Sequence, residues 1–595
     1  MLTLAKKGNT DYSIVIRKNP APSVFHAAEE LKHFLGEISG ADFPIRFDSA
    51  PMGEREIIVG ANAHLDVLNA EGASIDVPGL GKEGIWIKTV GERLVLAGSD
   101  VRGAMYAVYQ LLDEHLGCRW FTAQDSYIPH RSELTLPDTD ERFIPPLEFR
   151  EPYMLCYNDG AFFSRNRCNA ENGALLRFVC KWMDPQGVVH KNTLTEAEGG
   201  KVTYARFVHS LEEIVPTKEY FDAHPEYFAL RYDENGENPT RQSGYAQPCL
   251  TNPDVIEIAK KNVRKILDSC PEAEIISVSQ NDNQRYCQCD RCKAMDEAEG
   301  SHAGTLIRFV NAIAEDIEKD YPNVAVDTLA YQYTRKPPKL TKPRKNVIVR
   351  LCSIECCYGH PLESCSLSGT EGGQGSFTAD LEGWGEICKR LYIWDYAANF
   401  SRAIQPFPDL RVLAPNIRYY IRHGAKGIFE EGENCFPEHG ELNPLRQYLL
   451  AKLLWNPELD TELLIDEFLA GYYGMAAPAV RAWIDLLHAG VTEDVHVHIY
   501  DSVNQPYLSD EFLDKSEPLF DEAERMAEND TILARVKKLR LSIRFVRLSK
   551  TPADAPGRAE EAERFIEDVR ASGIGSYAEG SVLADLEPAI REGRY

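Results

Sequence analysis

The sequence predicts an α/β protein whose central part is a (β/α)8 TIM-type barrel. Between residues 146 and 440, short apolar runs alternate with segments whose apolar residues recur at helical spacing. Eight such runs, spread over about 300 residues, match the number of strands and the chain length that this barrel requires. An open doubly wound sheet is the structural alternative, but no Gly-x-Gly-x-x-Gly stretch follows the first strand to favour it.

The predicted barrel strands are short and are separated by helical segments. They are Glu148–Leu155, Tyr204–His209, Tyr227–Leu230, Glu274–Val278, Ala325–Tyr331, Asn346–Leu351, Arg390–Trp394 and Gly427–Phe429. The helices expected between them include Val255–Asp268, Gly304–Asp320 and Asn416–His423. In such a barrel the carboxyl ends of the strands surround the active site, so polar residues directly after strands are candidate functional residues.

Two further regions flank the predicted barrel. Residues 1–145 predict a small α/β domain that ends in a polar linker, Pro137–Pro146. Its expected strands are Tyr12–Arg17, Glu56–Gly60, Gly84–Lys88 and Arg93–Gly98, and its expected helices are His26–Leu35 and Ala104–Leu116. Residues 441–595 predict a C-terminal helical domain. Its expected helices are Leu445–Leu454, Glu462–Tyr472, Ala479–His488, Leu519–Glu528, Leu533–Leu548 and Glu560–Ala571.

The composition argues against several classes of partner. A net charge of −27 at pH 7 opposes binding to nucleic-acid phosphates and to an anionic membrane surface. No stretch approaches the roughly 18 apolar residues of a membrane span, and the first residues lack the apolar core of a signal peptide. We therefore expect a cytoplasmic protein that binds a neutral or cationic small molecule, with homo-oligomerisation left open.

Asp282 is the leading catalytic candidate. It lies in the polar run Gln280-Asn281-Asp282-Asn283, directly after the predicted strand Glu274–Val278. Polar side chains at a barrel mouth are costly to bury unless they contact one another or a ligand. An Asx turn that simply ends the strand is the alternative interpretation.

The last two strands end in further carboxylates. Trp394-Asp395-Tyr396 combines a carboxylate with two rings that could stack on a pyranose, although a core tryptophan beside a helix-capping aspartate is equally consistent with the pattern. Glu430 and Glu431 follow the eighth strand. Because successive strand residues alternate faces, only one of these two glutamates can point into the barrel.

Three other strand ends supply candidate sugar-binding residues. His209, Tyr331 and Glu355 follow the second, fifth and sixth predicted strands. Paired carboxylates suit glycosidic cleavage, in which one carboxylic acid protonates the leaving oxygen and a second group acts as base or nucleophile. A substrate acetamide can replace the enzyme nucleophile, and Asn281 beside Asp282 could then orient that amide.

The cysteines form a separate pattern. The chain has 15 cysteines, several in tight clusters, which favours free thiols and metal ligands over a secreted disulfide framework. Cys287, Cys289 and Cys292 follow Asp282, and Cys249 lies one helix earlier. Four thiolates could hold a structural zinc ion, with reduced thiols or one disulfide as the alternatives. No His-Glu-x-x-His motif indicates a catalytic metal, so no cofactor is expected to be required.

Several motifs in combination resemble a known family. They are Ser277–Asn283, Cys287–Cys292, Thr328–Tyr333, Trp394–Tyr396, Phe429–Gly432 and Gly471–Gly474. Together they resemble the bacterial proteins that carry the domain of unknown function 4838, which is related to glycoside hydrolase family 163. The first 145 residues, through Arg102–Tyr106 and Gly117–Phe121, resemble the non-catalytic α/β domain that precedes the barrel in α-glucuronidases and β-hexosaminidases.

This resemblance implies a glycoside hydrolase that cleaves N-acetylglucosamine-containing glycans, as an endo-β-N-acetylglucosaminidase with substrate-assisted retention. It also favours Glu430 over Glu431. We thus predict Asp282, Glu430 and Asp395 as catalytic carboxylates. The predicted sugar-binding residues are His209, Asn281, Tyr331, Glu355, Trp394 and Tyr396. The alternatives are an inverting hydrolase similar to α-glucuronidases and a non-catalytic carbohydrate-binding protein on a degenerate barrel.

Overall fold

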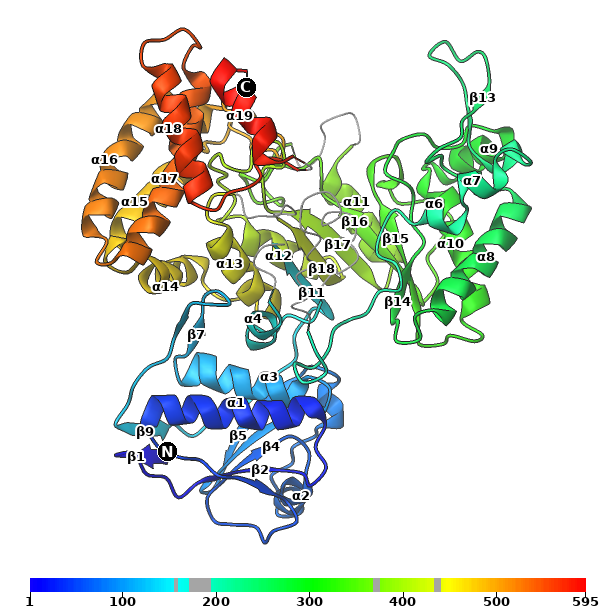
Figure 1. Cartoon of the computed structure of the whole chain (residues 1–595). Helices are drawn as coiled ribbons and strands as arrows, with labels where there is room; N and C mark the ends of the chain where they lie inside the picture. The colour runs from blue at the N-terminus through cyan, green and yellow to red at the C-terminus, as the bar shows by residue number, and fades with distance from the viewer. Residues whose placement is uncertain (155–158, 171–193, 368–374, 433–439, 580, 595) are drawn as a thin grey trace.

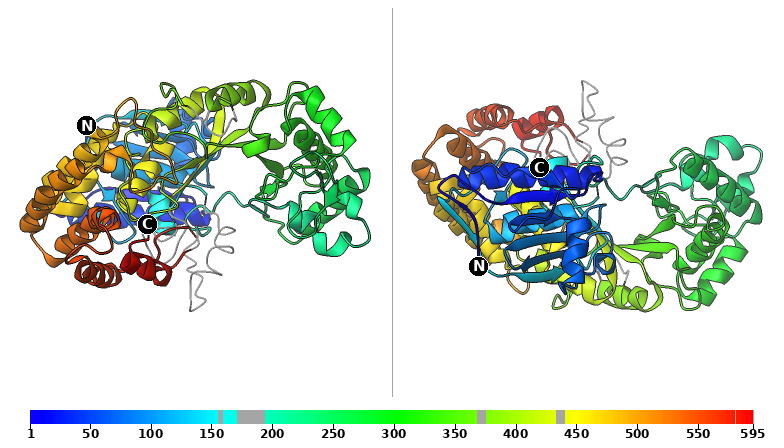
Figure 2. Two further views of the ribbon diagram at one scale, coloured as in Figure 1. Left: turned by 90° about the horizontal axis from the view of Figure 1, so that it is seen from above. Right: turned by 90° about the horizontal axis from the view of Figure 1, so that it is seen from below.

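The computed structural model describes residues 1–594, apart from residues 155–158, 171–193, 368–374, 433–439 and 580. An N-terminal α/β region, a central parallel sheet and a C-terminal set of helices follow one another along the chain (Figure 1). Three helices extend from one end of the central sheet, and the C-terminal helices lie at its opposite end (Figure 2). These three are α8 (Pro253–Asp268), α9 (Asp290–Glu299) and α10 (Ala303–Ile317).

The N-terminal region contains a six-stranded sheet in the order β10-β5-β6-β4-β2-β3, with helices on both faces. Its strands are β2 (Ser13–Ile16), β3 (Ile45–Phe47), β4 (Glu56–Val59), β5 (Ile85–Val90), β6 (Arg93–Gly98) and β10 (Asp140–Phe143). Its helices are α1 (Pro22–Ser39), α2 (Ala63–Ala70) and α3 (Gly103–Gln110). Alternate residues of β4 divide between the faces, since Ile57 and Val59 pack with α1 and α3 and Ile58 packs with α2.

The prediction that Pro137–Pro146 is a linker is wrong, because part of it belongs to this sheet. Strand β10 pairs antiparallel with β5, and Asp140 lies opposite Lys88. The indole of Trp86 donates a hydrogen bond of 2.7 Å to the Asp140 carboxylate. Edge strands often carry charged residues, which oppose pairing of the free edge with another chain. In sequence, such a polar strand is easily mistaken for a loop.

The central sheet has six parallel strands in the order β11-β18-β17-β16-β15-β14. The strands are β11 (Phe149–Tyr153), β14 (Ile275–Ser277), β15 (Ala325–Ala330), β16 (Val347–Cys352), β17 (Leu391–Tyr396) and β18 (Ala425–Glu431). Six of the eight predicted strands are therefore confirmed, with bounds that differ by at most two residues. The predicted helices around this sheet are confirmed as α8, α10 and α12 (Leu413–Arg422).

The other two predicted strands do not complete a barrel. In Tyr204–His209 only Tyr204 forms a bridge, parallel to Ile275 of β14. In Tyr227–Leu230 the chain passes through a 3-10 turn, and Leu230 begins a short antiparallel pairing of β12 (Leu230–Arg231) with β13 (Thr240–Arg241). The described residues thus form a parallel half-barrel, and the prediction of a closed eight-stranded barrel is wrong.

Local packing explains the error at Tyr227. Its ring lies 6.2 Å from that of Tyr220, and the Phe228 ring lies 5.6 Å from that of Phe221. These apolar side chains are thus buried by a neighbouring short helix instead of by a strand ladder. Periodicity alone does not distinguish a short buried strand from another short buried segment.

Arg350 of β16 occupies the interior of the half-barrel. Its guanidinium pairs with the Asp327 carboxylate at 3.3 Å and donates to the Tyr204 hydroxyl at 2.6 Å. Both ionic side chains are fully buried. Four aromatic rings enclose the guanidinium at 5.1 to 5.8 Å, and they are Phe149, Tyr204, Phe207 and Tyr392. This cluster fixes Tyr204 beside the sheet although its segment makes a single bridge.

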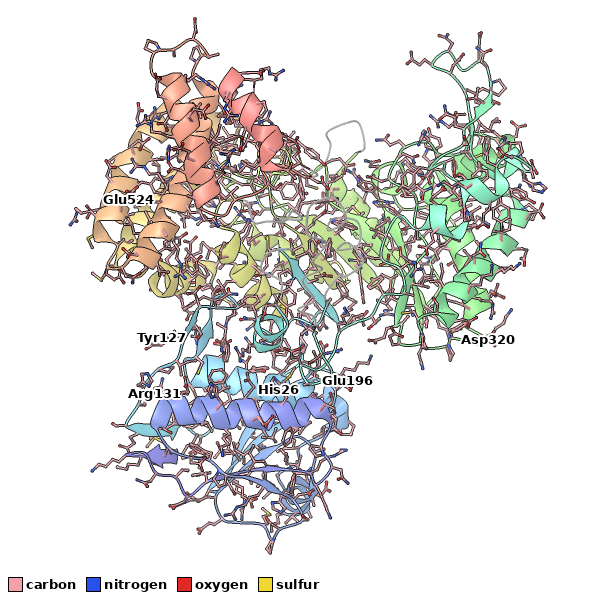
Figure 3. All side chains as sticks on the ribbon, viewed as in Figure 1. His26, Tyr127, Arg131, Glu196, Asp320 and Glu524 are labelled. Carbon is pink, nitrogen blue, oxygen red and sulfur yellow. The ribbon has the colours of Figure 1, made fainter. Side chains whose placement is uncertain are left out.

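The C-terminal region is helical, as predicted. Its helices are α13 (Asn443–Trp455), α14 (Thr461–Tyr473), α15 (Ala477–Ala489), α16 (Asp510–Met526), α17 (Asp530–Lys550), α18 (Arg558–Ala571) and α19 (Leu583–Glu592). The last of these is not predicted from the sequence. Charged side chains such as Glu524 lie on the outer surface of this region (Figure 3). Among the described residues, no helix is both long and apolar enough to cross a membrane.

A buried ionic cluster joins the three regions. The Asp113 carboxylate, which lies just after α3, pairs with Lys452 of α13, with Arg167 at 2.6 Å and with Arg119 at 3.2 Å. Burial opposes ionisation, but the three cations hold the pKa of Asp113 well below its usual range. The Trp455 ring at the end of α13 also packs on Tyr106, with ring centroids 5.4 Å apart.

The interior ion pair gives a stability prediction. Replacing Arg350 with Met should destabilise the protein by about 3 to 5 kcal/mol, because Asp327 is left buried without its counter-ion. Thermal and urea unfolding of R350M measure the effect. R344M, which removes a half-buried arginine paired with the surface residues Glu315 and Glu318, is the control and should change stability little. Equal stability of R350M and the wild type would contradict the prediction.

Candidate active site

A cavity of about 300 Å³ lies at the carboxyl ends of the parallel strands. It is lined by Val208, His209, Tyr245, Asp282, Leu329, Tyr331, Cys352, Ile354, Trp394, Tyr396, Phe400, Glu431, Tyr500 and Glu579. Five of the predicted site residues are therefore brought together here, namely His209, Asp282, Tyr331, Trp394 and Tyr396. This position is where the active sites of parallel α/β barrels lie.

Strand alternation selects which residues reach this cavity. Trp394 and Tyr396 of β17 face it, and their partners in register on β18 are Phe429 and Glu431. Residues in register on adjacent strands share a face, so Glu431 is the inward carboxylate. The Trp394 indole donates a 2.9 Å hydrogen bond to Glu431 Oε2, which fixes the carboxylate beside the ring.

Glu430 and Asp395 lie on the opposite face of the sheet, in register with each other. Asp395 is buried and accepts hydrogen bonds from Ser353 at 2.6 Å and from the Tyr420 hydroxyl at 2.8 Å. Burial, together with the neighbouring carboxyls of Asp395 and Asp409, raises the pKa of Glu430 well above its ordinary value. Neither of these two predicted carboxylates lines the cavity, whereas Glu431 does.

Asp282 and Asn281 take different positions although they are adjacent. Asp282 is exposed at the cavity rim, and its backbone N–H donates to the Tyr245 hydroxyl at 3.1 Å. The Asn281 side chain is fully buried, donates to the Ala246 carbonyl at 2.8 Å and accepts from the Glu212 N–H at 2.9 Å. Asn281 therefore holds two loops together and does not line the cavity, contrary to the prediction.

His209 lines the cavity in a constrained conformation. Its backbone φ is 52°, in the left-handed region that few non-glycine residues adopt. Its N–H donates to Ser279 Oγ at 2.9 Å, and its Nδ1 lies 2.8 Å from the Gln280 carbonyl oxygen. Since a carbonyl only accepts, Nδ1 carries a proton in this contact. The chain thus orients His209 before any ligand binds.

Of the predicted sugar-binding residues Tyr331 and Glu355, only Tyr331 lines the cavity. Tyr331 lines the cavity and its hydroxyl accepts a 3.0 Å hydrogen bond from the Gln332 amide. Burial and the nearby Asp282 carboxylate raise the pKa of Tyr331, so its hydroxyl stays protonated. Glu355 does not line the cavity but pairs with the buried Arg335 at 3.1 Å, so its predicted sugar contact is not supported by this geometry.

Two cavity residues come from the C-terminal region and are missed by sequence reasoning. Tyr500 and Glu579 face the strand ends, and the backbone N–H of Glu579 donates to the Phe400 carbonyl at 2.8 Å. Burial and the carboxylates of Glu579, Glu431 and Asp282 raise the pKa of Tyr500 to about 12. These three acids line the same cavity as Tyr500. No strand precedes Tyr500 or Glu579, so no sequence signal marks them.

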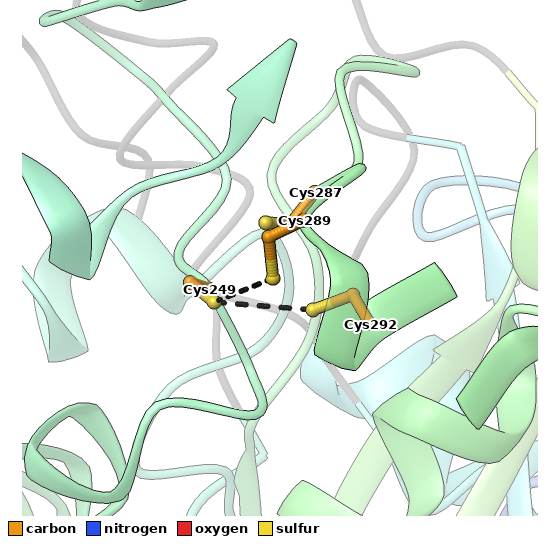
Figure 4. A group of neighbouring side chains, drawn as sticks. All are labelled: Cys249, Cys287, Cys289 and Cys292. Atoms are coloured by element: carbon orange, nitrogen blue, oxygen red, sulfur yellow. Dashed lines mark hydrogen bonds between the residues drawn. The ribbon is translucent and has the colours of Figure 1, made fainter. Parts of the chain in front are cut away.

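The four predicted cysteine ligands lie together (Figure 4). They belong to segments close in sequence to the cavity residues Tyr245 and Asp282. Cys249 Sγ lies 3.7 Å from Cys289 Sγ and 3.8 Å from Cys292 Sγ, and Cys287 completes the group. These two separations exclude a disulfide from Cys249 to either neighbour, since bonded sulfurs are about 2.05 Å apart, and all four cysteines are free thiols. The neighbouring thiols of Cys287 and Cys292 lower the pKa of Cys249, which favours the thiolate that metals bind. The group could hold a metal ion.

Comparison with family models agrees with the sequence analysis. The model described as "Domain of unknown function (DUF4838)" matches residues 120–485, which is more than half of the chain. The model of the glycosyl hydrolase family 67 N-terminus matches residues 4–111. The predicted family resemblance is thereby confirmed. No curated protein matches this sequence.

Several solved structures share the fold at low sequence identity. A family GH115 4-O-methyl-α-glucuronidase with specificity for decorated arabinogalactans is 12% identical over 99% of this chain and 77% of its own, with a TM-score of 0.56. A GH138 enzyme targeting pectin rhamnogalacturonan II is 12% identical over 98% of both chains, with a TM-score of 0.54. A family 89 glycoside hydrolase from Clostridium perfringens is 10% identical over 92% of this chain and 65% of its own, with a TM-score of 0.51.

The different environments of Asn281 and Asp282 give a prediction. N281A should destabilise the protein by about 1 to 3 kcal/mol, because it leaves a buried N–H and a buried carbonyl without partners. D282N changes an exposed carboxylate and should leave stability unchanged. Urea unfolding of the two variants measures both effects. A D282N variant as unstable as N281A would contradict the placement of these two side chains.

Proposed function

We propose that this chain, which belongs to the DUF4838 family, is a glycoside hydrolase that cleaves glycans containing N-acetylglucosamine. The observation that carries the proposal is the cavity itself, where the carboxylates of Asp282 and Glu431 lie among aromatic side chains at the carboxyl ends of parallel strands. The solved structures that share this fold are themselves glycoside hydrolases, which supports the reaction class.

The lining of the cavity suits a sugar ring. Trp394, Tyr396 and Phe400 offer flat apolar faces, and the hydroxyls of Tyr245, Tyr331 and Tyr500 offer hydrogen-bond partners. Positive charge develops on the sugar in the oxocarbenium-like transition state of glycosidic cleavage. Carboxylates placed around that position stabilise the transition state more than the ground state.

We assign Asp282 and Glu431 as the two catalytic carboxylates. Asp282 follows β14 and Glu431 ends β18. Strands β15, β16 and β17 lie between these two, so the carboxylates reach the cavity from different parts of the sheet. A glycosidic bond held between them has one carboxylic acid to protonate the leaving oxygen and a second carboxylate to act as base or nucleophile. If the substrate acetamide is the nucleophile, the second carboxylate orients it. Asn281 cannot take that role, because both groups of its amide are already hydrogen-bonded.

The charges of the cavity lining argue against the alternative of an enzyme similar to α-glucuronidases. An α-glucuronidase needs a cationic subsite for the substrate carboxylate. Among the described residues that line the cavity there is no lysine or arginine. A neutral sugar such as N-acetylglucosamine therefore fits this part of the site better than a glucuronate.

Two variants test the catalytic assignment. D282N and E431Q should each lower turnover by about 10²-fold or more, because each removes a carboxylate from the cavity. E430Q is the matched control. Its carboxyl lies on the other face of the sheet, where burial and the neighbouring carboxyls raise its pKa well above the ordinary value, and glutamine preserves the shape of the side chain. Loss of activity in E430Q together with normal activity in E431Q would contradict the assignment.

A substrate panel tests the reaction class. We expect hydrolysis of aryl β-N-acetylglucosaminides or of N-acetylglucosamine-containing oligosaccharides, and no hydrolysis of aryl α-glucuronides. Inhibition by a thiazoline-type compound would show that the acetamide participates. Binding of these glycans by calorimetry without cleavage of any of them would instead support the non-catalytic carbohydrate-binding alternative.

We also propose that Cys249, Cys287, Cys289 and Cys292 bind one structural zinc ion. Four sulfurs placed about 2.3 Å from a tetrahedral zinc ion lie about 3.8 Å from one another, and Cys249 Sγ lies 3.7 and 3.8 Å from two of its neighbours. The ion would fasten the segment around Cys249 to the loop after Asp282, and it would take no part in catalysis.

Metal analysis tests this zinc site. C292S should lower the zinc content of the purified chain by one ion per molecule, because it removes one of the four ligands. C388S changes a buried cysteine outside the group and should leave the zinc content as in the wild type. Unchanged zinc in C292S would contradict the proposal.

A further inference from the structure

A second group of side chains that could hold a metal ion lies in two loops that also contribute residues to the cavity. Cys357, His360 and Cys365 belong to the loop after β16, and His496 belongs to the loop between α15 and α16. One ligand atom from each lies within 4.8 Å of the others. Cys365 and His496 are 131 positions apart in sequence, so only the fold brings them together.

The distances in the group match a tetrahedral metal site. Cys357 Sγ lies 3.5 Å from His360 Nδ1, and Cys365 Sγ lies 3.7 Å from His496 Nδ1. With zinc about 2.3 Å from sulfur and about 2.05 Å from nitrogen, a tetrahedral angle places sulfur and nitrogen about 3.6 Å apart. The two imidazole rings are 5.1 Å apart at their centroids and inclined by 72°, so they approach one point from different directions.

Hydrogen bonds from the surrounding chain orient the ligand atoms of Cys357 and His360. His360 Nε2 lies 3.1 Å from the Thr492 carbonyl oxygen, which can only accept, so Nε2 carries the proton and Nδ1 has the lone pair. The backbone N–H groups of Gly359 and Val497 donate to Cys357 Sγ at 3.4 and 3.5 Å. Such bonds orient the sulfur and the imidazole, as the outer partners of metal ligands commonly do.

We propose that Cys357, His360, Cys365 and His496 bind one zinc ion in a Cys2His2 site, separate from the four-cysteine group. Two thiolates and two imidazoles in a tetrahedral arrangement are characteristic of structural zinc. All four ligand positions are occupied by protein, so this ion has no open position for water and serves to hold the two loops together.

The site would act on the cavity through the chain that follows His496. Val497 accepts a backbone hydrogen bond from Tyr358 at 2.8 Å, and Ile499 accepts one from Phe400 at 2.8 Å. Tyr500, the next residue, lines the cavity. A metal ion that joins His496 to the β16 loop therefore positions Tyr500 over the strand ends. This structural role does not depend on which glycan the cavity accepts.

Zinc analysis of the full-length chain tests the proposal. We expect two zinc ions per chain in the wild type and one in C357S/C365S. C249S/C289S, which removes only the four-cysteine group, should also hold one, and C270S, which lies outside both groups, should hold two. Wild-type zinc content in C357S/C365S, or no zinc in C249S/C289S, would overturn the proposal.

A second measurement does not depend on the C357S/C365S variant folding. Cobalt bound by C249S/C289S should give the absorption of a tetrahedral ion with thiolate ligands, and the conservative change H496N should shift or abolish that spectrum. Cys357 and Cys365 should be alkylated quickly only after chelation. A spectrum unaffected by H496N, or the recovery of a peptide with Cys357 and Cys365 joined by a disulfide, would refute a zinc site at this position.

Discussion

The side chains of parallel strands alternate between two faces, and this constraint decides which residues of the chain can share the site. Trp394 and Tyr396 face the cavity, so the residue between them, Asp395, faces the outer layer. Residues in register on the next strand share these faces. Glu431, which pairs with Tyr396, therefore faces the cavity, and Glu430, which pairs with Asp395, faces away from it. Each strand end can offer only every second residue to a ligand. A carboxylate between two cavity-lining rings is therefore excluded from the cavity.

The same alternation decides which side chains occupy the interior below the cavity. Arg350, two residues before the cavity-lining Cys352, packs among aromatic rings and pairs with Asp327. Tyr204 joins this pair through its hydroxyl, which keeps its segment beside the sheet where a full strand would lie in a closed barrel. The half-barrel is thus held by a polar core enclosed by rings, and the acidic cavity lies directly above it.

Parts of the chain outside the sheet complete the cavity. The segment that ends at Tyr500 crosses the β16 loop, and the segment at Glu579 joins the chain at Phe400 through a backbone hydrogen bond. Two groups of side chains that could hold metal ions lie in segments that also contribute to the cavity, one around Cys249 and one around Cys357. Loops that carry functional side chains need such fastening, because they lack a regular ladder of hydrogen bonds.

The sequence by itself determined the α/β class, six of the central strands, most of the helices, the family and the place of Asp282, because these depend on local periodicity and on motifs. Only the tertiary structure decided that the sheet stays a half-barrel, since closure depends on pairing between distant segments such as Tyr204 and β11. It likewise placed Glu431, and not Glu430, at the cavity, because Glu431 is in register with Tyr396 of β17. It also brought Tyr500 and Glu579 to the cavity, and His496 to the group around Cys357, from distant parts of the chain. The periodicity of a sequence indicates which residues of one element share a face. Which elements those faces then contact depends on how the elements pack in the folded chain.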